Sequence, residues 1–340
     1  MRPTSSTQRA MAVSPSPSSR PASPTITVTS PTPTVPLASV STAFPPTADR
    51  GPAPDTVLIS SDDVQFYISA AALLPRFSSL LPASGPPIAG VPSARAPDAA
   101  ETLNIVLHVA HGRSPAAFSP SVAALAGAAD RLPAYGLDAR AALAPGQPLH
   151  TLLAAQAPLA PMAVYVAAAR ADAYALAATA SAYLLSYPLY TVTDELAEEM
   201  GAVYLGRLFM LHRRRLDALK GYLAQAPEQH PERPGCGFAE QATLTKNWLY
   251  TTACIMIEAQ PDTSAGAIET TLYTLMPQLK CSLCKASLKA RIERLAVEWS
   301  LLGVGIQPPV RKRHAQSIPR SEQSDPRQLR PLVYLGPGHK

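Results

Sequence analysis

Three cysteines and one histidine carry the clearest chemical signal in the sequence. Cys281 and Cys284 form a C-x-x-C pair at the expected start of a helix, and Cys236 lies in a turn-rich Pro-Gly-Cys-Gly segment. One such pair supplies half of a tetrahedral zinc site, so further ligands are needed. We expect Cys236 to be the third ligand and His212 the fourth, with His230 as the alternative. These side chains are therefore candidate ligands of a structural zinc ion.

Two other interpretations of the cysteines remain open at this stage. Cysteine is among the most often buried residue types and can act as a small hydrophobic side chain, and two neighbouring thiols can form a redox pair. The fourth cysteine, Cys254, lies in an apolar helical stretch, so we expect it in the core. A metal site requires the other three sulfurs to meet at one point, whereas core cysteines would point into separate apolar pockets.

No catalytic constellation accompanies these residues. The chain has no Gly-rich phosphate loop, no nucleophile elbow and no helix with paired metal-binding histidines. Four acidic residues cluster at the expected start of a helix, where capping and the helix dipole account for them: Asp194, Glu195, Glu198 and Glu199. We therefore expect a protein that is not an enzyme.

Proline and charge divide the chain into a folded body and two tails. Of the 37 prolines in the 340 residues, twelve fall within 1–54, and 308–340 carries seven Lys or Arg residues against two acidic ones. Such segments bury too little apolar surface to offset their ordering entropy, so we expect both tails to be disordered. The body is then net acidic although the whole chain carries +5. This distribution argues against direct binding of nucleic acid.

The sequence also bears on membranes and on the cellular compartment. Residues 173–193 lack charge, but they are rich in Ala, Ser and Thr and contain Pro188, so we expect buried helices and no membrane span. No apolar secretory segment follows Met1. Four cysteines in a chain without such a segment favour an intracellular protein, cytoplasmic or nuclear, with free or metal-bound thiols.

The folded body is expected to begin with β-structure. Residues 56–68 predict a β-hairpin with Val64, Phe66 and Ile68 on one face. A helix is expected at 70–81, a loop at 82–98, and a strand followed by a helix at 102–111.

The rest of the body has helical periodicity. Ser119 or Ser121 is expected to cap a helix that ends at Gly136, and Thr193 to cap another. Further helices are expected at 148–157, 161–185 and 202–223, and three more follow a Pro/Gly-rich break at 226–237.

Several of these segments resemble fungal BTB/POZ proteins that carry an appended helical region. DTVLISSDDVQF at 55–66, NIVLHVAHG at 104–112 and LPAYGL at 132–137 resemble successive parts of the BTB/POZ domain, and 191–220 and 236–302 resemble the appended region. Two departures are Ser69-Ala70, where a polar or basic residue is common, and His111, where tyrosine is usual.

The resemblance implies an α+β, mostly α fold. A small BTB/POZ-like β-sheet capped by helices would occupy 55–157, a helical extension 158–225, and a C-terminal helical region with the C-x-x-C pair 226–307, between the disordered tails 1–54 and 308–340. It implies a non-enzymatic protein–protein interaction module, either a dimerising scaffold or an adaptor for a cullin-type ubiquitin ligase. The implied partners are proteins, including a second copy and a cullin, with no nucleic acid and no membrane. The alternative is a nuclear or transcriptional regulator that combines the module with the basic tail.

Overall fold

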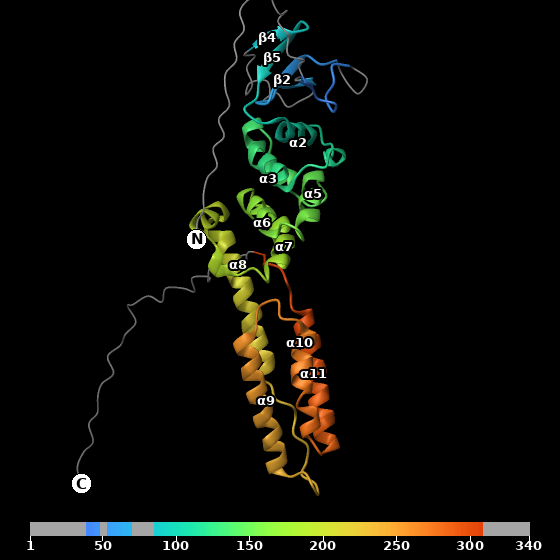
Figure 1. Ribbon diagram of the computed structural model, residues 1–340, viewed down its shortest axis with the longest axis vertical. Coiled ribbons are helices and arrows are strands. Elements are labelled where there is room, and N and C mark those ends of the chain that lie inside the picture. The colour runs from blue at the N-terminus through green and yellow to red at the C-terminus, as the bar shows by residue number, and fades with distance from the viewer. Residues whose placement is uncertain (1–38, 48–52, 70–84, 309–340) are drawn as a thin grey trace, which may run out of the picture. The chain divides into compact units, whose positions relative to one another are not determined.

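The computed structural model describes residues 39–47, 53–69 and 85–308 (Figure 1). Within these residues the protein is α+β and mostly α, as the sequence predicts, because one small sheet is accompanied by a long series of helices. The helix expected at 70–81 and most of the two tails lie outside the described residues.

A mixed sheet of five strands forms the β-structure. Its strands are β1 (Ser39–Val40), β2 (Thr56–Ile59), β3 (Val64–Ile68), β4 (Gly85–Ile88) and β5 (Val91–Arg95), in the spatial order β1-β3-β2-β5-β4. The predicted hairpin is β2–β3, in which Leu58 lies opposite Phe66. Phe66 and Ile68 are buried in the core and Val64 packs against it, so the predicted face of the hairpin is confirmed.

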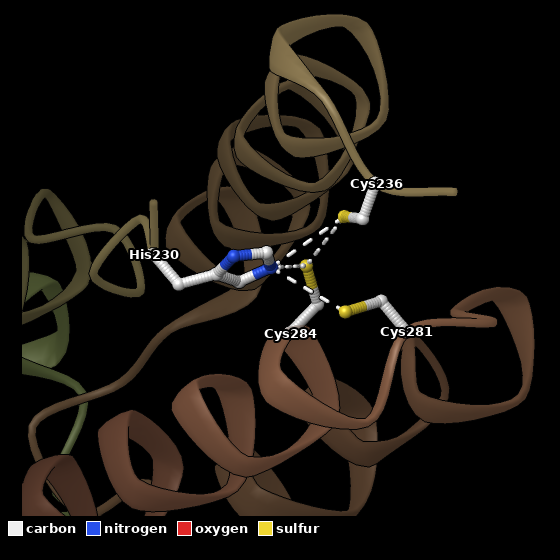
Figure 2. Close-up of side chains that lie close together, drawn as sticks. All are labelled: His230, Cys236, Cys281 and Cys284. Atoms are coloured by element: carbon white, nitrogen blue, oxygen red, sulfur yellow. Dashed lines mark hydrogen bonds between the residues drawn. The ribbon is translucent and has the colours of Figure 1, made fainter. Parts of the chain in front are cut away.

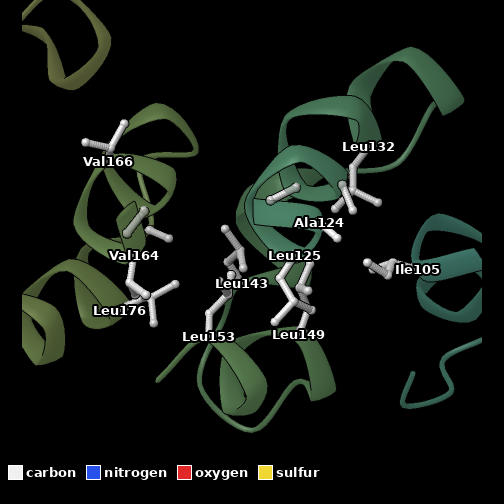
Figure 3. Close-up of a cluster of buried hydrophobic side chains, with 14 of the residues drawn as sticks. Ile105, Ala124, Leu125, Leu132, Leu143, Leu149, Leu153, Val164, Val166 and Leu176 are labelled. Carbon is white, nitrogen blue, oxygen red and sulfur yellow. The ribbon is translucent and has the colours of Figure 1, made fainter. Parts of the chain in front are cut away.

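In the described residues between the sheet and α8 (Asp194–Leu223) there are six α-helices: α2 (Ala100–Ala110), α3 (Val122–Arg131), α4 (Ala139–Ala142), α5 (Pro148–Gln156), α6 (Pro161–Arg170) and α7 (Tyr174–Ser181). The Ser121 hydroxyl caps α3 by accepting the backbone N–H of Ala124, and Gly136 has the left-handed conformation expected after that segment. Leucines from several of these helices pack in one cluster (Figure 3), including Leu125 of α3, Leu149 of α5 and Leu176 of α7. These helices and the sheet share one hydrophobic core.

The C-terminal part contains the four helices α8 (Asp194–Leu223), α9 (Phe238–Glu258), α10 (Ala265–Tyr273) and α11 (Ser282–Leu301). Helix α8 begins at the predicted Thr193 cap and is interrupted at Gly201, whose φ is 68°. Buried side chains of α9, α10, α11 and the C-terminal end of α8 form a second hydrophobic cluster around Trp248 and Trp299. Short 3₁₀ segments complete the described helices: Ala116–Phe118, Leu132–Tyr135, Ala182–Leu184, Leu189–Thr191 and Met276–Gln278.

The structure corrects three expectations about local structure. Residues 39–47 belong to the fold and not to a disordered tail, because Ser39 and Val40 pair with β3 and Phe44 is buried in the core. The loop expected at 82–98 contains β4 and β5, since an outer strand such as β4 tolerates Pro86 and Pro87. The strand expected near residue 102 is absent, because α2 begins at Ala100.

The uncharged run at 173–193 is divided between α7 and two short 3₁₀ turns. Among the described residues, no helix combines the length and the apolar character that a membrane crossing needs.

Candidate metal centre

Four side chains from two segments far apart in the sequence converge on one point. The Nε2 atom of His230 and the sulfurs of Cys236, Cys281 and Cys284 all lie within 4.8 Å of one another. Figure 2 shows the imidazole ring facing the three sulfurs, which come from the loop before α9 and from the start of α11. The predicted convergence of the three cysteines is confirmed, and an apolar arrangement with separate sulfur pockets is excluded.

The distances within the cluster suit a single tetrahedral ion. The Nε2 atom of His230 lies 3.5 Å from the sulfur of Cys236, 3.4 Å from that of Cys281 and 3.3 Å from that of Cys284. The sulfurs of Cys236 and Cys284 are 3.5 Å apart. A tetrahedron with Zn–S bonds of about 2.3 Å and a Zn–N bond of about 2.0–2.1 Å has S···N edges of about 3.6 Å and S···S edges of about 3.8 Å. The four side chains therefore enclose a space of the size that a zinc-like ion needs.

The hydrogen bonding of His230 determines its tautomer. The ring nitrogen that faces the sulfurs, Nε2, is the one without the proton. The Nδ1 atom of His230 lies 2.8 Å from the carbonyl oxygen of Pro231, and because a carbonyl only accepts, Nδ1 must carry the proton. In the neutral ring, Nε2 then presents a lone pair to three sulfurs. One lone pair accepts one S–H, so hydrogen bonds cannot satisfy all three contacts, whereas a cation can. Metal-binding histidines commonly donate their other N–H to a backbone carbonyl in this way.

Two features hold the ligands in the loop, Cys236 and His230: a tight turn and the buried side-chain amide of Gln241. The backbones of Arg233 and Cys236 hydrogen-bond to each other, and between them Gly235 has φ 82°, the value that a type II turn requires after Pro234. The buried Gln241 of α9 binds both backbone polar groups of His230. The turn thus directs Cys236 toward the cluster, and Gln241 holds the histidine in place.

The cysteines of the C-x-x-C pair occupy the start of α11, with Cys281 as the N-cap residue and Cys284 in the first turn. The backbone N–H of Cys284 donates to the Cys281 sulfur and lowers the pKa of this thiol to about 6, so the metal-binding thiolate is favoured there. Burial raises the pKa of Cys284 and of Cys236, and a bound cation would offset that burial.

The structure corrects the choice of histidine. His212 lies in α8 with its Nε2 2.9 Å from the carbonyl oxygen of Leu184, and it is buried away from the cysteines. His230, the alternative, is the residue that joins them. The signal that favours His230 is its distance of only six residues from Cys236 within one loop, which needs no packing between distant elements.

Cys254 does not take part in the cluster and does not lie in the core. It is exposed, because the buried face of α9 is defined by Leu244, Trp248 and Ile255. Within the described ranges, the His230–Cys236–Cys281–Cys284 group is the one set of at least three His, Cys, Asp or Glu side chains whose ligand atoms meet closely enough for a metal ion.

In comparisons with known proteins, no family model, curated protein or solved structure matches this chain.

Proposed function

We propose that this protein is a non-enzymatic scaffold of the BTB/POZ type whose C-terminal helical module is held together by a structural zinc ion. The observation that carries the zinc assignment is the closed Cys3His cluster. The four protein side chains would supply all four ligands of a tetrahedral zinc ion, whereas catalytic zinc sites keep one position for water or substrate. Three sulfurs with one imidazole nitrogen are a ligand set that suits zinc.

The position of the cluster supports a structural role. Its ligands come from the loop after α8 and from the start of α11, and that loop lies in the Pro/Gly-rich break between α8 and α9. A metal ion there links a segment with little apolar burial of its own to the helices on either side. Metal binding of this kind contributes directly to folding free energy.

The order of elements in the N-terminal region supports the BTB/POZ part of the proposal. A β-hairpin, β2–β3, precedes helices that end at Tyr135-Gly136, in the order that the sequence resemblance implies. We propose protein partners for this region, a second copy of the chain or a cullin, in an intracellular compartment that keeps the thiols reduced.

Metal analysis of the purified full-length chain tests the zinc assignment. We expect one zinc per chain, retained in Cys254→Ser and lost in Cys236→Ser and Cys284→Ser. Chelation should lower the helical circular-dichroism signal of the C-terminal module. A chain that contains no zinc and resists chelators with unchanged stability would contradict the proposal.

Sedimentation velocity and a binding assay with a purified cullin test the scaffold part separately. Concentration-dependent dimerisation or saturable cullin binding would support the BTB/POZ assignment. A chain that stays monomeric and binds no cullin would contradict the BTB/POZ assignment, whatever its zinc content.

A further inference from the structure

We propose that the metal cluster is also a modification site for small peroxides, at which oxidation of Cys281 forms a disulfide and releases the ion. This inference rests on the proposed zinc site. It concerns a property that a purely structural site need not have, namely access of a reagent to the ligating sulfur atoms.

A cavity reaches the cluster from the side of the cysteines. It has a volume of about 340 Å³ and is lined by Cys236, Cys281 and Cys284 together with polar side chains of α9, including Glu240 and Asn247. A water molecule occupies about 30 Å³ in the liquid, so this space admits hydrogen peroxide easily. A second cavity, on the side of His230 and Leu283, has no cysteine in its lining. Small molecules therefore reach the metal site on its sulfur side.

The three cysteine residues differ in exposure, and this difference indicates an order of events. Cys236 and Cys284 are buried, while Cys281 at the N-cap of α11 is partly exposed. Oxidation of cysteine requires access of the oxidant, and Cys281 is the most exposed of the three cysteines that line the cavity, so it is the first to react. The two buried sulfurs lie within 4.8 Å of it and can act as resolving thiols.

The chemistry balances with one peroxide for each disulfide. The Cys281 thiolate attacks a peroxide oxygen, the O–O bond breaks, and with one proton the products are a sulfenic acid and water. A neighbouring thiol, from Cys284 or Cys236, then attacks the sulfenic sulfur and displaces a second water as the S–S bond forms. The two cysteines lose two electrons and the peroxide gains them. Because a disulfide sulfur is a poor metal ligand, two of the four positions are lost and the ion dissociates.

The test uses the zinc-loaded full-length chain with Cys254→Ser, which removes the exposed cysteine outside the cluster. Hydrogen peroxide is added, released zinc is followed with a chromogenic chelator, and disulfides are mapped by mass spectrometry after alkylation. We expect loss of the one bound zinc, a disulfide that includes Cys281, and recovery of zinc binding after reduction. The matched variant, Cys281→Asp, keeps an N-capping metal ligand without the sulfur, and we expect zinc release about tenfold slower.

Each outcome bears on a different claim. A chain without zinc before the peroxide is added contradicts the proposed function itself. Zinc that is held but not released, or a disulfide joining Cys236 to Cys284 with Cys281 unmodified, overturns this inference alone. Where Cys281→Asp fails to hold zinc, the disulfide map of the parent chain decides the matter.

Discussion

The guanidinium of Arg215 in α8 lies over the ring of Trp299 in α11, with its Cζ atom 4.3 Å from the ring centre. The same buried side chain donates hydrogen bonds to the carbonyl oxygens of Pro261 and Leu302, at 2.6 and 3.0 Å. One arginine thus links α8, the loop after α9 and the end of α11. It does so by a cation–π contact with Trp299 and by hydrogen bonds to the carbonyl of Pro261 in that loop and of Leu302 at the end of the helix.

Replacement of Arg215 should destabilise the C-terminal module strongly. Arg215→Met removes the donors and leaves buried carbonyls without partners, so we expect a loss of about 3 kcal/mol in the free energy of unfolding. Arg214→Met is the matched control, because Arg214 is the exposed neighbour on the same helix; its effect should stay within about 0.5 kcal/mol. Urea unfolding followed by tryptophan fluorescence measures both, and equal effects would show that Arg215 is not buried as described.

Gln241 should set the affinity for zinc without touching the ion. Its Nε2 donates to the His230 carbonyl and its Oε1 accepts the His230 N–H, both at 3.0 Å. Residues that orient a ligand commonly contribute 10–100-fold to metal affinity, so Gln241→Leu should weaken zinc binding by about that factor. Competition with a chelator measures the change. Gln260→Leu, just beyond the end of α9, should leave the affinity unchanged, and an unaffected Gln241→Leu would contradict the positioning role.

Phe66 should be the costliest aromatic residue to truncate in the β-hairpin. It is only 1% exposed, so Phe66→Ala should lower the free energy of unfolding by about 3–5 kcal/mol through lost burial and a cavity. Phe238→Ala makes the same change at a residue that is 70% exposed and should cost less than about 1 kcal/mol. A loss below about 1 kcal/mol for Phe66→Ala would mean that the hairpin register is wrong.

Acid should destabilise the protein through its buried histidines. Burial lowers the pKa of His108 and of His212, so the unfolded chain binds protons more readily than the folded one. Their contribution to the free energy of unfolding is therefore complete above about pH 6.5, the usual pKa of histidine. It is lost as the pH falls below that value. His212→Gln should flatten this part of the stability curve relative to the parent. Parallel curves would show that His212 does not titrate on unfolding. The cysteine thiols contribute equally to the pH dependence of stability in the parent and in His212→Gln, so the comparison of the two proteins isolates the histidine.

The sequence predicts those parts of the fold that have a local signal. Thr193 and Ser121 cap the helices they were expected to cap, and Gly136 takes the left-handed conformation, because capping and turn chemistry depend on a few adjacent residues. β1 forms by pairing with β3, some 25 residues later in the chain. The segment that forms β4 and β5 contains prolines and glycines, which usually indicate a loop. Such pairing has no signature in the segment itself.

The candidate site was predictable in its sulfurs and not in its histidine. The C-x-x-C spacing places Cys281 and Cys284 on one side of a helix start, and the Pro-Gly turn directs Cys236 toward them. The choice between His212 and His230 depends on which histidine the packing of α8 buries elsewhere, and the carbonyl of Leu184 takes His212. Cys254 shows the same limit, since an apolar helix has an exposed face that residue type alone does not identify.

X-ray absorption at the zinc edge of the purified full-length chain tests the central claim most directly. The account predicts one zinc per chain bound by three sulfur atoms at about 2.3 Å and one nitrogen at about 2.0 Å. In His230→Ala the nitrogen contribution from imidazole should disappear while the three sulfur atoms remain, and in His212→Gln the spectrum should not change. A spectrum in which the atoms bound to zinc are mainly oxygen and nitrogen would contradict the Cys3His site at His230. So would a spectrum in which the imidazole contribution disappears only in His212→Gln.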